Sequence, residues 1–271
     1  MSSGITDNHV TARFNSAAAT YHDQPGVQYE VAGKVADMCT DPQFLPSGEV
    51  SDILEIGCGT GYLTRLLAEH FEDAEIVATD VSRSMIDTVR KYLQRHTNVV
   101  LHPVDVRSMS LSPARDLIVS SSALHWINPL PPVLQRLMDA LRPGGVLVCA
   151  LMTRGTLCEL HDLRKQIAPD KQTETELPDA QELIASLNKD GYEMDYAVEQ
   201  SITVQYPTAL DFMKTLNRQG VTGGFFNSAN RLNRTELKKL VTAYDQLYPH
   251  PDGGVRATYN VFYLVYKAGQ V

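Results

Sequence analysis

Residues Ile53 to Gly61 read ILEIGCGTG, an apolar run followed by a glycine-spaced turn, and they are the strongest chemical signal in the chain. The glycines allow the main chain to approach a ligand closely. The following segment, Tyr62 to His70, has helical periodicity, and the free N–H groups of such a helix point at whatever binds there. A dinucleotide fingerprint needs two residues between its second and third glycines, whereas only Thr60 lies here. The spacing predicts a nucleotide-type cofactor and argues against a pyrophosphate.

Three carboxylates accompany the glycine turn. The predicted strand Ala74 to Asp80 ends in an acid about 20 residues after the glycines, where a carboxylate can accept from both ribose hydroxyls. Asp105 follows the strand Val99 to Val104, in a position to accept from an adenine amino group. Glu55 lies inside an apolar strand, and a buried carboxylate needs partners. Each acid alone could be a strand end or a helix cap, but the combination predicts an adenosine site.

Further strands and helices must position these residues. A helix is expected from Ser84 to Arg95, and a fourth strand from Asp116 to Ser120 leads into the phrase SSALHW. The next helix should end at the turn LRPGG, residues 141–145, before a fifth strand from Val146 to Met152. This alternation of strands and helices is typical of a parallel α/β sheet.

The order of glycine loop, acid after the second strand, acid after the third and LRPGG turn resembles the class I S-adenosylmethionine-dependent methyltransferases. The resemblance implies an α/β fold with a Rossmann-like seven-stranded sheet whose last strand is antiparallel. Helical patterns outside this core add the expectation of an N-terminal helical lid and an inserted helical cap. It also implies that Glu55 helps to organise the methionine end of the cofactor.

The second half of the chain has the remaining expected elements. Residues 155–191 have a helical pattern with a polar break at 168–176, Asp195 to Tyr206 has the alternation of a sixth strand, and Ala257 to Lys267 reads as the last strand. The intervening stretch has two helical patterns, at 210–217 and 235–247, and is too long and too apolar for a plain loop. The expected organisation is an N-terminal lid at 1–48, a methyltransferase core at 49–206 and 255–271, and an inserted cap at 207–254.

Composition narrows the class of protein. The chain has 271 residues, of which 43% are hydrophobic, so it can bury a substantial core. Its formal charge of −8 argues against nucleic-acid binding by the chain as a whole. No long apolar run or secretory segment is visible, so no membrane association is expected. The four cysteines lack metal-ligand spacing, and we expect reduced thiols in the cytoplasm and no metal.

A narrower resemblance spans nearly the whole chain. The phrases RFNSAAATYHDQ from Arg13, GTLCELH at 155–161, GVTG at 220–223 and ATYNVFYLV near the end are similar to the malonyl-acyl-carrier-protein O-methyltransferases of biotin biosynthesis. The resemblance implies an acyl carrier protein bearing malonyl-phosphopantetheine as partner. It also implies methyl transfer from S-adenosyl-L-methionine to the free malonyl carboxylate, giving S-adenosyl-L-homocysteine and the methyl ester that primes pimeloyl synthesis. Two positions depart from the pattern, because Ser121 stands where relatives usually have Asn and His125 where Gln is common.

The implied reaction needs little acid–base chemistry. A carboxylate with a pKa near ~4 is already ionised at pH 7, so no general base and no catalytic acid–base residue is expected. In-line positioning and the exclusion of water should then provide the rate enhancement.

The candidate site residues fall into three groups, each with the alternative of a purely structural role. Expected cofactor-binding residues are Tyr21, Glu55, Gly57, Cys58, Gly59, Gly61, Asp80, Val81, Met85, Asp105, Val106 and Ser121. Expected substrate-binding residues are Tyr21, His125, Trp126, Arg154, Arg218 and Tyr259. Acyl carrier protein is strongly acidic, so a basic docking surface is expected, and the densest basic cluster is Arg231, Arg234, Lys238 and Lys239. A solvated helix face is the alternative for that cluster.

Two other functions remain open from the sequence. A small-molecule carboxyl methyltransferase of the trans-aconitate type shares the core and a similar SSALHW phrase, and it would need no carrier. A non-catalytic protein that binds S-adenosylmethionine and acts through a partner would bind the cofactor without turnover.

Overall fold

The computed structural model describes residues 15, 26–45, 49–111, 115–171, 176–220 and 231–269. The chain forms two compact units, which we call the core unit and the cap unit. The core unit contains Pro25–Thr153, Leu177–Gln200 and Val261–Val271, and the cap unit contains Met1–Gln24, Arg154–Glu176 and Ser201–Asn260. Tyr21, most of the motif that begins at Arg13, and residues 221–223 lie outside the described residues.

Seven strands form one sheet with the order β3-β2-β1-β4-β5-β7-β6. The neighbours from β3 to β5 are parallel, and β7 runs antiparallel to β5, which confirms the expected fold class. The strands are β1 Asp52–Ile56, β2 Glu75–Asp80, β3 Val99–Pro103, β4 Arg115–Ser121, β5 Leu141–Met152, β6 Tyr196–Tyr206 and β7 Val255–Lys267.

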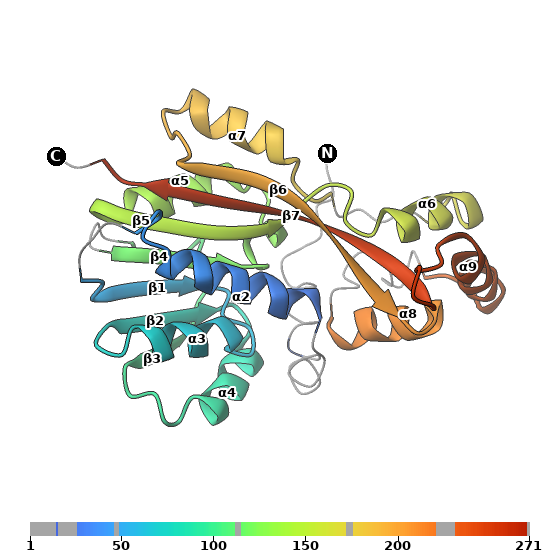
Figure 1. The fold of residues 1–271 in the computed structure, drawn as a ribbon, viewed down its shortest axis with the longest axis horizontal. Coiled ribbons are helices and arrows are strands. Elements are labelled where there is room, and N and C mark those ends of the chain that lie inside the picture. Colours follow the sequence, from blue (N-terminus) through green and yellow to red (C-terminus); the bar gives the residue numbers. More distant parts are fainter. Residues whose placement is uncertain are drawn as a thin grey trace. The chain divides into compact units, whose positions relative to one another are not determined.

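Helices cover both faces of the core-unit sheet (Figure 1). One face is covered by α2 Val27–Thr40, α3 Tyr62–His70 and α4 Arg83–Tyr92, and the other by α5 Pro131–Asp139 and α7 Ala180–Lys189. The buried side chains of α5 and α7 form one apolar cluster with β1, β4, β5 and β7. Because β1 and β4 are covered on both faces, they consist largely of buried residues, as expected for central parallel strands.

Among its described residues, the cap unit contains the helices α6 Cys158–Ile167, α8 Ala209–Arg218 and α9 Arg234–Leu247. Each of the long strands β6 and β7 contributes residues to both units. Aromatic rings fill the interior of the cap unit, where Phe212 contacts both Tyr206 and Tyr244 with ring centroids 5.0 and 5.3 Å apart. No helix in the described part of the chain is long and apolar enough to span a membrane.

Several element boundaries differ from expectation for identifiable reasons. Helix α4 begins at Arg83 because the Ser82 side chain accepts from the Met85 N–H, and it ends at Tyr92, three residues before the expected end. The expected turn LRPGG is part of β5, since Leu141 pairs with Arg115 before the register shifts to Val146 opposite Leu117. The predicted helix from Tyr62 to His70 is confirmed at both ends.

Candidate cofactor site

The glycine loop has the backbone that its sequence requires. Gly57, Gly59 and Gly61 have φ angles of 73°, 54° and 81°, which side chains rarely adopt. A Cβ added to Gly57 would lie 2.2 Å from the Cβ of Ala123, whereas a Cβ on Gly59 would meet nothing within 4 Å. Gly57 therefore permits close packing, and Gly59 faces open space in which a ligand can approach the main chain.

Asp80 connects the loop to the next helix. Its carboxylate accepts from the Gly59 N–H at 2.9 Å and from the Ser82 N–H at 2.7 Å. Burial raises the pKa of Asp80, and the two N–H donors act in the opposite direction. Each carboxylate oxygen has two lone-pair sites, so these two bonds leave acceptor capacity for ribose hydroxyls. Asp80 can hold the loop and a ligand together.

Glu55 lies in the centre of the sheet and is 1% exposed. Burial raises its pKa to about 7, and the charge of Asp80 adds to this effect, while the nearby Thr64 hydroxyl lowers the value in part. Even so, neither Glu55 Oε2 nor Thr64 Oγ1 makes a hydrogen bond of normal geometry within the described residues. A buried carboxylate without a full set of partners indicates that a polar group is missing beside it.

Ser121 and Ser122 extend this group of unsatisfied atoms. The hydroxyl oxygens of both are buried and have no hydrogen-bond partner in the described residues. Glu55 pairs with Val119, two residues before Ser121 on β4, so Glu55 and Ser121 lie on the same face of the sheet. Ser122 has a φ of 55°, a costly conformation for a residue with a side chain. Unsatisfied carboxyl and hydroxyl oxygens beside an open glycine loop fit a polar cofactor.

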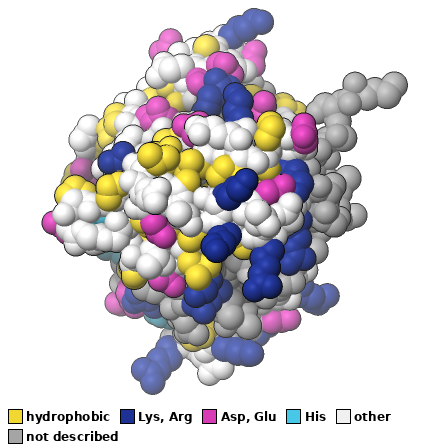
Figure 2. All heavy atoms as spheres, turned by 90° about the vertical axis from the view of Figure 1, so that its right-hand side faces the viewer, with side chains coloured by type: hydrophobic (Ala, Val, Ile, Leu, Met, Phe, Trp, Pro, Cys, Tyr) yellow, Lys and Arg dark blue, Asp and Glu magenta, His cyan; other side chains and the backbone are white. Residues whose placement is uncertain are grey.

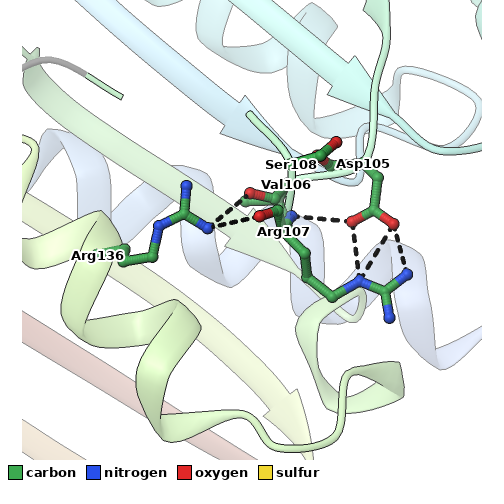
Figure 3. Close-up of polar contacts among 5 residues, drawn as sticks. All are labelled: Asp105, Val106, Arg107, Ser108 and Arg136. Carbon is green, nitrogen blue, oxygen red and sulfur yellow. Dashed lines mark hydrogen bonds and ion pairs between the residues drawn. The ribbon is translucent and has the colours of Figure 1, made fainter. Parts of the chain in front are cut away.

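Asp105 follows β3 and is held by Arg107 (Figure 3). Its carboxylate accepts from the Arg107 backbone N–H at 2.9 Å and from the Arg107 Nε and Nη2 atoms. This guanidinium lowers the pKa of Asp105, so the carboxylate stays ionised. Among the neighbouring candidates, Val106 and Met85 are buried, whereas Val81 is 43% exposed.

His125 and Trp126 form a short 3-10 helix after β4. The His125 imidazole is buried and accepts from the Met152 N–H through Nδ1 at 3.4 Å. Burial lowers its pKa to about 3, so the ring is neutral at physiological pH. The Trp126 ring lies 5.1 Å from the His125 ring between centroids. A neutral, buried imidazole cannot supply a charge to a substrate carboxylate.

The structure does not bring the other substrate candidates into the core unit. Arg154, Arg218 and Tyr259 belong to the cap unit, where both arginines are exposed. Tyr259 is buried, and its hydroxyl lies 3.0 Å from that of Tyr206. Burial raises the pKa of Tyr259, so its phenol stays protonated. Substrate binding by these residues stays a prediction.

Of the four basic residues predicted to dock a carrier, Arg231 lies three residues before α9, the other three lie in the first half of α9, and all four are exposed. Figure 2 shows several Lys and Arg side chains on the face that carries the cap-unit helices, with hydrophobic, Asp and Glu side chains among them. The helix begins at a capping box of Asn233 and Glu236, and Glu236 also accepts from Lys171 Nζ at 2.7 Å. This ion pair connects the start of α9 to Lys171, which lies four residues after the end of α6.

Sequence reasoning missed several residues around this site. Arg107 lies two positions after Asp105, and that spacing could have suggested a local ion pair. Ser122 adjoins a predicted residue, but its positive φ gives no sequence signal. Arg136, on α5, contacts the loop after β3 from 27 to 30 residues away. No local pattern could have connected these segments.

Known proteins that are similar to this chain in sequence include methyltransferases. A family model described as a methyltransferase domain matches residues 54–147. The malonyl-[acyl-carrier protein] O-methyltransferase of Acetivibrio thermocellus is 27% identical over 93% of this chain and 90% of its own length. Its namesake in Halalkalibacterium halodurans is 26% identical, covering 97% of this chain and 99% of the relative. The namesake in Priestia megaterium is 37% identical over 55% of this chain and 53% of its own length.

Solved structures show the same fold at low identity. The YcgJ protein of Bacillus subtilis superimposes with a TM-score of 0.60 at 11% identity, covering 89% of this chain and 99% of that one. The N-methyltransferase NodS of Bradyrhizobium japonicum, solved with S-adenosyl-L-homocysteine, gives 0.53 at 17% identity, covering 96% and 98%.

Proposed function

We propose that this S-adenosylmethionine-dependent methyltransferase methylates the free carboxylate of a malonyl thioester on acyl carrier protein, releasing S-adenosyl-L-homocysteine and a methyl ester. The observation that carries the proposal is the alignment with relatives of that name over 93% and 97% of the chain. The glycine loop and the unsatisfied polar atoms of the core unit support the cofactor part of the proposal.

The cofactor supplies a methyl group activated on a sulfonium. We assign its ribose to Asp80 and its adenine to Asp105, each of which ends or follows a strand at the carboxyl edge of the sheet. The methionine end is assigned to Glu55 and Ser121, where a hydroxyl replaces the amide that relatives usually carry. Ser122 and Thr64 join this group because their hydroxyls are also unsatisfied.

The protein needs to position the substrate carboxylate and to remove water from it. It does not need to move a proton. The substrate carboxylate is ionised at neutral pH, so it needs no base. His125, the titratable ring nearest the end of β4, is neutral and buried and is not required as one. Orientation of the carboxylate and exclusion of water are then the main contributions of the protein. We propose that the inserted segment 207–254 covers the substrate side of the site.

Recognition of the malonyl group is assigned to cations and hydroxyl donors. Arg154 and Arg218 are the proposed partners of a carboxylate, with Tyr21 and Tyr259 as hydroxyl donors and Trp126 as apolar wall. The acidic carrier is assigned to the exposed basic cluster at the beginning of α9, because opposite charges steer association.

The decisive experiment measures methyl transfer from radiolabelled S-adenosylmethionine to malonyl-acyl carrier protein, malonyl-coenzyme A, free malonate and trans-aconitate in parallel. A base-labile labelled ester on the carrier is the expected result. Label found only on the free acids would contradict the carrier assignment and favour the small-molecule class. Cofactor binding without label on any acceptor would contradict carboxyl methylation altogether.

A further inference from the structure

The geometry points to Arg107 and Arg136 as positioning residues that set recognition of the cofactor's adenine amino group through Asp105. This inference rests on the proposed placement of adenine at Asp105. It concerns the short loop from Asp105 to Met109 and the helix α5, which the sequence gives no reason to connect (Figure 3).

Arg107 orients the carboxylate of Asp105. Three donors reach it, namely the Arg107 backbone N–H at 2.9 Å from Oδ1, the Nε–H shared between both oxygens at 3.0 and 3.1 Å, and an Nη2–H on Oδ2. An ionised carboxylate has about four lone-pair sites. Four contacts occupy these sites, two on each oxygen, but the Nε–H is shared between the oxygens, so it can stay on one oxygen while the adenine amino group takes a site on the other. The guanidinium fixes the direction in which that site points.

Arg136 fixes the backbone that carries this pair. Its Nη1 donates to the carbonyl oxygens of Val106 at 3.3 Å and Arg107 at 2.9 Å, and its Nη2 donates to that of Met109 at 2.6 Å. Within the described part of the chain Arg136 forms no ion pair, so its charge is directed entirely at this loop. The planar fork of arginine suits several acceptors at once, which an ammonium cannot reproduce.

The loop has its own weaker restraints, which explains why a helix side chain is needed. The N–H groups of Ser108 and Met109 donate to the Asp105 carbonyl at 3.0 and 3.1 Å, and the Val104 N–H donates to the Asp80 carbonyl at 2.9 Å. These bonds shape a turn and tie its start to β2. They do not fix the carbonyls of residues 106, 107 and 109, which Arg136 contacts.

The test uses a pair of ligands that differ at one group. S-adenosylhomocysteine carries the 6-amino group, and S-inosylhomocysteine carries a 6-oxo group that presents an acceptor to the Asp105 carboxylate. Dissociation constants of both are measured by calorimetry on the full chain. The ratio of the two constants is independent of the fraction of folded protein, so a variant that is merely less stable leaves it unchanged.

We expect the wild type to prefer the amino ligand by roughly tenfold or more, since a lost hydrogen bond to a charged group is costly. The preference should fall at least threefold in Arg107→Gln and Arg136→Gln, with Arg136→Lys intermediate. Arg115→Gln, which removes an arginine paired with Asp52 at the opposite edge of the sheet, is the matched control and should keep the full preference.

The variants distinguish the placement of adenine at Asp105 from the positioning role of the two arginines. If Asp105→Asn leaves the preference unchanged, adenine does not lie at Asp105 and the cofactor placement fails. If Asp105→Asn abolishes the preference while Arg107→Gln and Arg136→Gln weaken both ligands by the same factor, the placement stands and the positioning role is overturned. Tighter binding of the amino ligand by Arg107→Gln would also overturn it, because Arg107 would then compete with adenine.

Discussion

The core unit and the cap unit differ in charge and in how completely their polar groups are satisfied. The core unit contains 12 Lys and Arg against 21 Asp and Glu, a formal charge of −9, whereas the cap unit contains 12 against 11, a formal charge of +1. The net charge of −8 for the whole chain therefore describes neither unit. Of the two units, the cap unit should repel an acidic partner less than the core unit does.

Buried polar groups show the second contrast. In the core unit, Glu55 Oε2 and the hydroxyl oxygens of Thr64, Ser121 and Ser122 are buried and make no hydrogen bond of normal geometry within the described residues. In the cap unit, buried Glu159 accepts from the Thr258 N–H and hydroxyl, and Tyr206 and Tyr259 bond to each other. Because unsatisfied buried groups are costly, their concentration in one unit marks where a ligand belongs. The unsatisfied groups of the core unit support the proposed cofactor site there, and the exposed basic residues of the cap unit support the proposed docking of a carrier.

The largest expected effect comes from adding a side chain to the glycine loop. Gly57→Ala places a Cβ 2.2 Å from that of Ala123 at a φ of 73°, so the loop must move. Cofactor affinity should fall by about 100-fold or more, and stability by roughly 1–3 kcal/mol. Gly33→Ala is the matched control, because nothing lies within 4 Å of its added Cβ in α2. Calorimetry that found equal affinities in both variants would contradict the assignment of the loop.

The second-largest effect is expected at Glu55, whose titration should make both stability and cofactor affinity depend on pH. Its folded pKa is about 7 against an ordinary value of 4.5, so between these values the folded state binds more protons than the unfolded state. Stability of the ligand-free protein should then decline as pH rises from about 4.5 to 7, by up to about 3 kcal/mol. Cationic groups of the cofactor favour ionised Glu55, so affinity should rise with pH.

Glu55→Gln removes this titration while keeping the size of the side chain. Urea unfolding between pH 5 and 8 should show a flatter profile for the variant than for the wild type. The affinity for S-adenosylmethionine should lose its pH dependence in the variant over the same interval. Parallel profiles in both proteins would mean that Glu55 keeps one protonation state throughout.

Charge reversal tests whether the basic residues of α9 in the cap unit dock the acidic carrier. In the double variant Arg234→Glu with Lys238→Glu, the Michaelis constant for malonyl-acyl carrier protein should rise about 5- to 20-fold at low salt, with that for malonyl-coenzyme A nearly unchanged. Reversing two exposed lysines of the core unit, Lys91 and Lys189, is the matched control and should have little effect. Equal effects on carrier and coenzyme A substrates would reject docking at α9.

The sequence was sufficient for the sheet and for the local parts of the site. Glycine spacing and strand-end acids depend on backbone geometry within a few residues, and the loop from 57 to 61, Asp80 and α3 have the expected positions. The contacts of Arg136 and the burial of His125 depend on packing between segments that are far apart in the sequence. No local sequence pattern predicts such packing. The turn predicted at LRPGG lies within the range of β5 as an irregularity, because residues 142–145 have no partner on β4 between Leu141 opposite Arg115 and Val146 opposite Leu117.

The smallest expected effects come from removing either hydroxyl of the buried pair Tyr206 and Tyr259 in the cap unit. Tyr206→Phe and Tyr259→Phe each remove one partner of the 3.0 Å contact, so each should lower the free energy of unfolding by about 1 kcal/mol. If Tyr259 also contacts the malonyl group, only Tyr259→Phe should raise the Michaelis constant for the malonyl substrate, by about threefold, while cofactor affinity stays unchanged. Equal kinetic constants in the two variants would mean that the pair is structural and that Tyr259 does not contact the malonyl group.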